Sequence, residues 1–228
     1  MPSWNEYRYE KISRDHLQQV VALHEQCFPG YYLTQLGPSF LGVMYAWYLE
    51  SPEAIAHVAV GEDGRLVGFV AGTVNGATYR KSLFRKAWRP MLLALGGRLV
   101  SKPALTLRLV AERKDLVWQA VSTILRRGSG EEREAMAGSD REPPTASLVS
   151  IGVRPSARRS GVGASLSELF VAEARERGCE RVTLSVRADN VPARRFYEGM
   201  NWEEVTRSSK SYHGSVSITY QKELSDEQ

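Results

Sequence analysis

Apolar residues recur along the chain with helical and strand-like periods that alternate. Residues 14–27 follow helical spacing, and a second helical pattern covers residues 39–50. Residues 55–60 and 66–74 are strand-like runs, and the Asp63-Gly64 pair between them favours a tight hairpin. The first third of the chain therefore predicts two helices followed by an antiparallel strand pair.

The second half of the chain alternates strand and helix patterns before it ends in a hairpin. The predicted order is a strand at 148–153, a helix at 165–177, a strand at 181–186, a helix at 191–198, and strands at 202–207 and 216–222. This order predicts an α/β (α+β) fold, in which helices lie on the faces of one mixed sheet. An exposed strand at 216–222 would also allow a homodimer.

Residues 79–145 break this alternation. Within residues 82–100 six apolar side chains share one helical stripe, and Pro103 begins a second helical pattern that runs to about residue 125. The stripe consists of Phe84, Trp88, Met91, Leu92, Leu95 and Leu99. We expect an inserted helical hairpin in which Phe84, Trp88, Met91 and Leu95 pack on the core or on the second helix, with the arginines in solvent. The length of 228 residues fits a single domain, 1–228, that carries this insertion.

Positive charge is concentrated in the insertion. The formal net charge is only +4, but twelve of the thirty Lys and Arg residues and only two of the 26 acidic residues lie between residues 79 and 130. The cations of the first helix would suit a phosphorylated acceptor molecule or an anionic membrane surface. They are Arg80, Lys81, Arg85, Lys86 and Arg89. Nucleic acid is disfavoured, because the aromatic and glycine signatures of RNA-binding modules are absent.

Several features point to a cytoplasmic protein without a metal site. Cys27 and Cys179 form no CxxC pair and no metal-ligand spacing. The first residues lack the apolar core of a signal peptide. The apolar stretch at 91–99 is interrupted by glycines and an arginine, and it is far shorter than the roughly 20 residues of a membrane span.

A loop rich in arginine and glycine follows the strand at 148–153. Backbone N–H groups at a helix N-terminus favour an anion, and glycines allow a close approach to the backbone. A P-loop would need a lysine followed by Ser or Thr, but Ala164-Ser165 ends this loop. A dinucleotide fingerprint would need a third glycine where Leu166 stands. The loop, 158–164, therefore predicts an anion site of another kind.

Two stretches carry a resemblance to a known family. LVSIGVRPSARRSGVGASL, residues 148–166, resembles the signature of the Gcn5-related N-acetyltransferase (GNAT) family, with Arg158, Gly161 and Gly163 in its key positions. LSVRADNVPARRFYEGMNW, residues 184–202, is similar to the second motif of that family, although Asn201 stands where the family usually has glycine. Asparagine tolerates the left-handed backbone that such a turn requires.

The resemblance implies a GNAT-like fold, with a mostly antiparallel twisted sheet, and acetyl-CoA as the acyl donor. It implies that backbone groups of Ile151 and Val153 contact the pantetheine arm, together with the Asn190 side chain. The diphosphate would be cradled by the loop, with charge added by its two arginines. The implied loop residues are Arg158, Arg159, Ser160, Gly161, Val162, Gly163 and Ala164.

Tyr197 resembles the general acid of the family, and a phenol with a pKa of about 10 is protonated at neutral pH. No carboxylate lies within residues 148–153, where Ser150 stands. Proton removal from the amine therefore stays open to a water chain, to a residue of the 31–45 region, or to an acceptor amine of lower pKa. We expect an N-acetyltransferase that acts on a primary amine of a small acceptor, phosphorylated molecules and nucleotide-linked amino sugars included. Protein amines remain open as acceptors. The alternative is a non-catalytic coenzyme A-binding module that the basic insertion recruits to a partner or a membrane.

Overall fold

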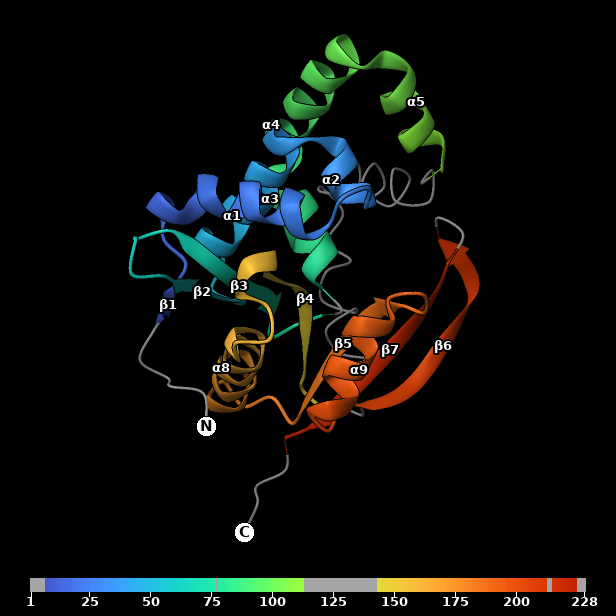
Figure 1. Ribbon diagram of the computed structural model, residues 1–228. Helices are drawn as coiled ribbons and strands as arrows, with labels where there is room; N and C mark the ends of the chain where they lie inside the picture. Colours follow the sequence, from blue (N-terminus) through green and yellow to red (C-terminus); the bar gives the residue numbers. More distant parts are fainter. Residues whose placement is uncertain (1–6, 77, 113–142, 213–214, 225–228) are drawn as a thin grey trace.

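The computed structural model describes residues 7–76, 78–112, 143–212 and 215–224, and it contains one mixed sheet (Figure 1). The described strands pair in the order β1-β2-β3-β4-β5-β7-β6, and β4 and β5 are the parallel pair among otherwise antiparallel neighbours. The strands are β1 (Arg8–Lys11), β2 (Ala54–Val60), β3 (Leu66–Thr73), β4 (Thr145–Val153), β5 (Arg181–Arg187), β6 (Glu203–Tyr212) and β7 (Ser215–Glu223). The mostly antiparallel sheet is confirmed, and β1 is an addition that no pattern predicted.

Helices cover both faces of the sheet. They are α1 (Leu17–Cys27), α2 (Tyr32–Leu36), α3 (Pro38–Glu50), α4 (Tyr79–Ser101), α5 (Pro103–Glu112), α8 (Val162–Glu176) and α9 (Val191–Gly199), with 3-10 turns at Arg14–His16 and Pro155–Ala157. The first core cluster joins α1, α3 and α4 to one face of β2 and β3, and the second joins α8 and α9 to the opposite face. Figure 1 shows this division, with α1 and α3 on one side of the strands and α8 on the other.

Glycines in β3 let α8 lie close to the sheet. A Cβ at Gly72 would lie 2.5 Å from the ring of Phe170, and a Cβ at Gly68 would lie 2.8 Å from Val162 and from Leu166. Such distances are too short for carbon atoms, so only glycine fits there. The close packing holds the first turn of α8 against the sheet, beside the end of β4.

The strands β4 and β5 separate halfway along their length. Residues 145–148 of β4 pair with residues 181–184 of β5, and beyond this point β5 continues to pair only with β7. The separation leaves the second half of β4 with one open edge. This opening is the structural basis of the cleft described below.

The inserted hairpin is present, but its buried face differs from the predicted stripe. Leu83, Ala87 and Met91 of α4 are buried against the core, whereas Leu92 and Leu99 are 56% and 41% exposed. Of the four stripe residues expected to pack inward, Met91 is buried, and Phe84 and Leu95 are partly buried against the first core cluster. The two leucines at positions 92 and 99 do not share this buried face. The predicted continuation of the second helix beyond Glu112, to about residue 125, lies outside the described ranges.

The chain end departs from the prediction in one respect. The strand β7 lies between β5 and β6, so the predicted exposed strand at 216–222 is wrong, and β6 forms that edge of the sheet. An exposed edge at 216–222 was the reason for expecting a homodimer, and the structure removes this reason. The left-handed turn at Asn201 is confirmed by its φ of 58°. In the described ranges, the helices lack the combination of length and apolar character that a membrane span requires.

Candidate functional site

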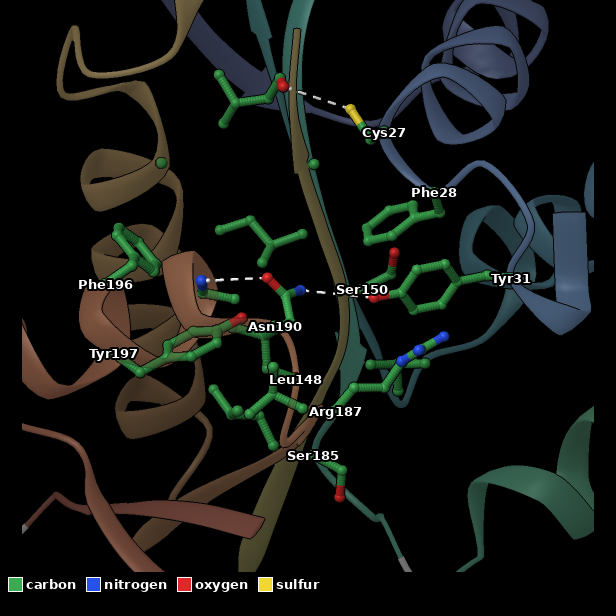
Figure 2. A pocket seen from close by; sticks show the side chains of 18 of the residues that line it. Cys27, Phe28, Tyr31, Leu148, Ser150, Ser185, Arg187, Asn190, Phe196 and Tyr197 are labelled. Atoms are coloured by element: carbon green, nitrogen blue, oxygen red, sulfur yellow. Dashed lines mark hydrogen bonds between the residues drawn. The ribbon is translucent and has the colours of Figure 1, made fainter. Parts of the chain in front are cut away.

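A cleft of about 970 Å³ opens where β4 and β5 separate. Figure 2 shows Phe28 and Tyr31 on one side of these strands and Phe196 and Tyr197 on the other. The first turns of α8 and the end of α1 also border the cleft. Residues from six separate stretches of sequence thus meet at one opening in the sheet.

The loop before α8 presents a series of free backbone amides. The N–H groups of residues 159–164 have no acceptor in the described part of the chain, and Ser165 is the first to bond, to the carbonyl of Gly161 at 3.0 Å. Arg159 and Gly161 have φ values of 66° and 88°, which lie in the left-handed region. When left-handed and right-handed residues alternate along the backbone, successive N–H groups point towards the same side. Six consecutive donors at a helix N-terminus form a site for an anion.

The loop side chains have different roles. The Ser160 hydroxyl donates to the Ala157 carbonyl at 2.7 Å and so stabilises the loop. Val162 is 1% exposed and packs in the core, so only its N–H is available to a ligand. Arg158 and Arg159 are exposed and border the cleft. Together with the positive end of the α8 dipole, the two guanidinium groups favour negative charge at this point.

The open edge of β4 offers a second set of backbone groups. The Arg154 N–H donates to the Val67 carbonyl on β3, and because backbone groups alternate along a strand, those of Ile151 and Val153 face away from β3, towards the opening. The Val153 carbonyl already accepts from Arg158 Nε at 3.2 Å and from the Cys27 thiol at 3.4 Å. The groups that remain suit an extended ligand that contains amides.

Asn190 has a structural role at the start of α9. Its Oδ1 accepts from the Ala193 N–H at 3.3 Å, and its Nδ2 lies 3.5 Å from the Tyr31 hydroxyl across the cleft (Figure 2). The side chain therefore caps α9, as the sequence position allows, while it also lines the cleft.

Tyr197 lies in the cleft wall with a free hydroxyl. The residue is 6% exposed, its ring packs against Phe196 and Trp202, and its hydroxyl makes no hydrogen bond to the described residues. Burial raises the pKa of Tyr197 above its ordinary value of 10, so the phenol stays protonated. In water, proton transfer from a phenol to a thiolate costs about 2 kcal/mol, and burial of the phenol adds to this cost. A thiolate in the same cleft is also desolvated, which raises its pKa and narrows the difference.

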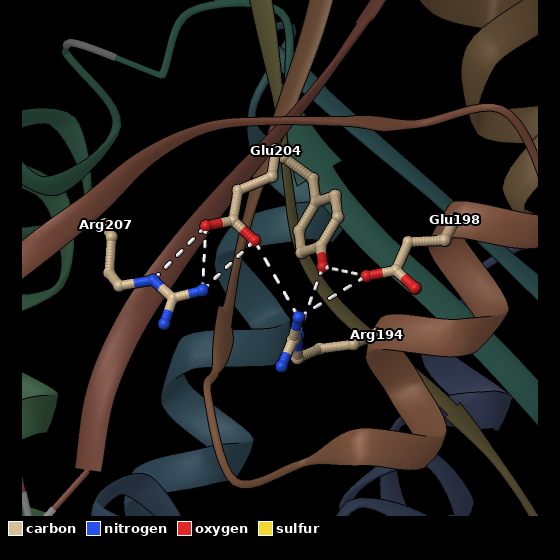
Figure 3. Close-up of polar contacts among 5 residues, drawn as sticks. Arg194, Glu198, Glu204 and Arg207 are labelled. Carbon is tan, nitrogen blue, oxygen red and sulfur yellow. Dashed lines mark hydrogen bonds and ion pairs between the residues drawn. The ribbon is translucent and has the colours of Figure 1, made fainter.

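A polar cluster fixes the helix that carries Tyr197. The Tyr220 hydroxyl on β7 donates to Glu198 at 2.7 Å and accepts from Arg194 Nε at 3.2 Å (Figure 3). Glu204 on β6 lies 3.8 Å from Arg194 and 3.0 Å from Arg207. These contacts join α9 to both strands of the terminal hairpin, so they hold Tyr197 in place.

A buried hydrogen-bond chain reaches the cleft from its other side. His24 Nδ1 lies 2.7 Å from the Tyr45 hydroxyl, which in turn donates to Ser150 Oγ at 3.5 Å. Burial lowers the pKa of His24 to about 4, so the imidazole is neutral at neutral pH. Ser150 is the polar side chain that β4 presents to the cleft. Sequence reasoning left the base open to a region that includes Tyr45, but nothing in the sequence singled out His24.

Arginine side chains bring positive charge to the lining of the cleft. Arg80 and Arg187 line it, and the Arg187 guanidinium lies 5.3 Å from the centre of the Tyr31 ring and pairs with Asp189 at 2.5 Å. Among the described residues, no Asp or Glu lines the cleft. The cleft as a whole therefore favours anionic ligands.

Comparisons with known proteins agree with this geometry. The model of the Acetyltransferase (GNAT) family matches residues 122–202. A search of curated proteins gives no significant match. The ribosomal-protein-S18-alanine N-acetyltransferase from Escherichia coli has a similar fold, with 15% identity, a TM-score of 0.55 and coverage of 96% of this chain and 95% of that chain.

Two further structures extend the range of similar proteins. NAA60 from Arabidopsis thaliana, solved in complex with acetyl-CoA, shows 16% identity and a TM-score of 0.57, with 96% of this chain and 98% of that chain covered. Nourseothricin acetyltransferase shows 16% identity and a TM-score of 0.51, with 96% and 99% covered. The family match covers β4, the loop, α8, β5 and α9, the segments that build the cleft. The chain therefore matches the model of the Acetyltransferase (GNAT) family over residues 122–202, and it shares the fold of solved acetyltransferases.

Proposed function

We propose that the protein transfers the acetyl group of acetyl-CoA to a primary amine of a small acceptor that carries a phosphate or another anionic group. The observation that carries the proposal is the row of six free amides at residues 159–164, which opens into the same cleft as the Tyr197 hydroxyl. A reaction that uses a phosphorylated thioester needs a binding site for the phosphates and a proton donor for the departing thiolate. The loop amides would supply the first and the buried Tyr197 hydroxyl the second.

Each part of the donor has a place along the cleft. The diphosphate takes the amides of 159–164 and the charge of Arg158 and Arg159, and the pantetheine amides take the free groups of Ile151 and Val153. Asn190 contacts the same arm from the opposite wall. This arrangement directs the thioester into the opening between β4 and β5, beside Tyr197 and Ser150.

The reaction then needs an amine nucleophile and a proton for the departing thiolate. The nitrogen of a neutral amine forms a bond to the acetyl carbon, the carbon–sulfur bond breaks, and the thiolate takes the Tyr197 proton. The amine proton passes to Ser150 or to water and finally returns to Tyr197, so that the products are an amide and a neutral thiol. The Ser150 hydroxyl, held by Tyr45, orients the amine.

The charge of the cleft supports the acceptor class. A polycationic amine would need carboxylates, but the described lining contains none and includes Arg80 and Arg187. An acceptor with a phosphate group, such as a nucleotide-linked amino sugar, would pair with these arginines. The similar structures include a ribosomal-protein-S18-alanine N-acetyltransferase and nourseothricin acetyltransferase, so protein amines and nourseothricin belong in the same test.

Binding calorimetry tests the anion cradle. Coenzyme A should bind about 10 to 100 times more tightly than pantetheine, which lacks the diphosphate, because charge-assisted hydrogen bonds contribute about 1.5–3 kcal/mol. Replacing both loop arginines, R158A and R159A, should narrow this ratio, whereas R195A, on the exposed part of α9, should leave it unchanged. Equal affinity for coenzyme A and pantetheine would rule out the cradle.

Thiol release from acetyl-CoA tests the activity across a panel of amines with and without phosphate groups. Amine-dependent release, fastest with an anionic amine, is the expected result. Tight coenzyme binding without release on any amine would favour the non-catalytic module instead.

A further inference from the structure

The hairpin of α4 and α5 exposes an unusual amount of aliphatic surface. It extends beyond α3 and away from the sheet (Figure 1). Five of the eight large hydrophobic side chains that are exposed in the described residues lie on it, and Leu93 and Val100 are 78% and 86% exposed. The five are Leu92, Leu93, Leu99, Val100 and Leu107. Single exposed leucines are ordinary, but a cluster of this kind marks an interaction surface.

The same hairpin carries only positive charge in its described side chains. Residues 79–111 contain eight Lys and Arg residues and no Asp or Glu. The eight are Arg80, Lys81, Arg85, Lys86, Arg89, Arg98, Lys102 and Arg108. Arg98 binds the Gln35 carbonyl, and the Arg89 guanidinium lies 5.2 Å from the centre of the Trp88 ring. Aliphatic and cationic groups therefore share residues 79–111, a stretch whose sequence contains no carboxylate.

Helical spacing places both kinds of side chain on the outer face of α4. The buried face contains Leu83, Ala87 and Met91, and positions 85, 89, 93, 96 and 100 recur at intervals of three or four on the opposite face. The outer face is cationic near the body of the protein and apolar near the turn to α5, where exposed Lys102 follows. An interfacial helix has this composition, since aliphatic groups enter the lipid boundary while cations stay among the headgroups.

We propose that the outer face of the α4–α5 hairpin docks on an anionic lipid bilayer. The aliphatic side chains are exposed on a hairpin that extends away from the sheet, and acyl chains can adapt to such side chains (Figure 1). Their cationic neighbours match the negative surface potential of such a membrane. A nucleic acid would account for the arginines but not for Leu93 and Val100. The proposal is independent of the acceptor and of the acetyl transfer.

Vesicle co-sedimentation of the full chain tests the docking. The protein should pellet with phosphatidylcholine vesicles that contain phosphatidylserine about tenfold more than with pure phosphatidylcholine, and added salt should weaken this binding. The double variant L93S and V100S should lose about tenfold in binding, because both side chains are exposed and their loss removes only the inserted surface. Arg89→Glu should lose a similar factor.

Matched controls lie on other elements of the protein. Val205→Ser on β6, 46% exposed, and Arg14→Glu, whose side chain is 85% exposed, should leave vesicle binding unchanged. The aliphatic double variant should also keep the thiol-release activity in the absence of vesicles. No pelleting with phosphatidylserine vesicles at low salt would overturn the proposal. The proposal would also fail if the aliphatic double variant bound vesicles as tightly as the wild type. It would fail as well if Arg89→Glu abolished binding to RNA and left binding to vesicles unaffected.

Discussion

Replacing Tyr197 with phenylalanine removes one oxygen atom from the wall of the cleft and leaves the ring in place. The ring packs against Phe196, Trp202 and Tyr220, contacts that phenylalanine preserves. The hydroxyl has no partner among the described residues. We therefore expect the free energy of unfolding to change by less than about 0.5 kcal/mol.

The effect on catalysis should be much larger. Loss of a general acid lowers kcat by about 10² to 10⁴, which corresponds to about 3–5 kcal/mol in the transition state. Because burial raises the pKa of Tyr197 above 10, its phenol stays protonated throughout the neutral and mildly alkaline range, and kcat of the wild type should show no alkaline fall from this residue there. Affinity for acetyl-CoA should stay within about twofold, since the hydroxyl acts only on the departing sulfur.

The assay follows thiol release with the best amine of the panel, and calorimetry gives the acetyl-CoA affinity. Tyr220→Phe is the matched control, because it removes the same atom from a tyrosine whose hydroxyl binds Glu198 and Arg194. It should lower the free energy of unfolding by about 1–2 kcal/mol. Wild-type kcat in the Tyr197 variant, with acetyl-CoA still bound, would refute the acid role. A loss of stability equal to that of the control would identify the hydroxyl as structural.

Three further predictions concern the core and the second wall of the cleft. Gly72→Ala should lower the free energy of unfolding by about 2–3 kcal/mol in urea titrations, because its Cβ would lie 2.5 Å from the Phe170 ring; an unchanged midpoint would contradict this packing. Burial would raise the pKa of Glu173, but hydrogen bonds to its carboxylate, including one from His57 Nε2 at 2.6 Å, outweigh burial and lower this pKa. The ionised Glu173 therefore stabilises the fold fully above the unfolded pKa of about 4.5. This stabilisation is lost as the pH falls through the lower pKa of the folded state. Glu173→Gln should cost about 2 kcal/mol at pH 7 and less at pH 4, and an equal loss at both pH values would exclude the linkage. Ser150→Ala should lower kcat/KM for the amine about tenfold without changing coenzyme A affinity, and a parallel loss of both would show that Ser150 serves the coenzyme instead.

Local patterns in the sequence predicted most elements of the fold, because period, turn residues and helix ends act over a few neighbours. The Asp63-Gly64 turn, the α8 helix and the left-handed Asn201 all follow from such short-range rules. Some helix boundaries differ from the predicted ones. Helix α8 starts at Val162, three residues before the predicted start, because Gly161 takes the left-handed N-cap position. The glycine loop was predicted to be an anion site for the same local reason.

The sequence by itself thus determined the order of most elements, the position of the glycine loop and the basic character of the insertion. Only the tertiary structure decided that β7 enters between β5 and β6, that Tyr45 meets Ser150 across 105 positions of sequence, and which side of α4 faces outward. The physical reason is that these features depend on pairing and packing between segments distant in sequence. No local period or turn rule specifies which distant surfaces will meet, since that depends on how the whole chain buries its apolar area.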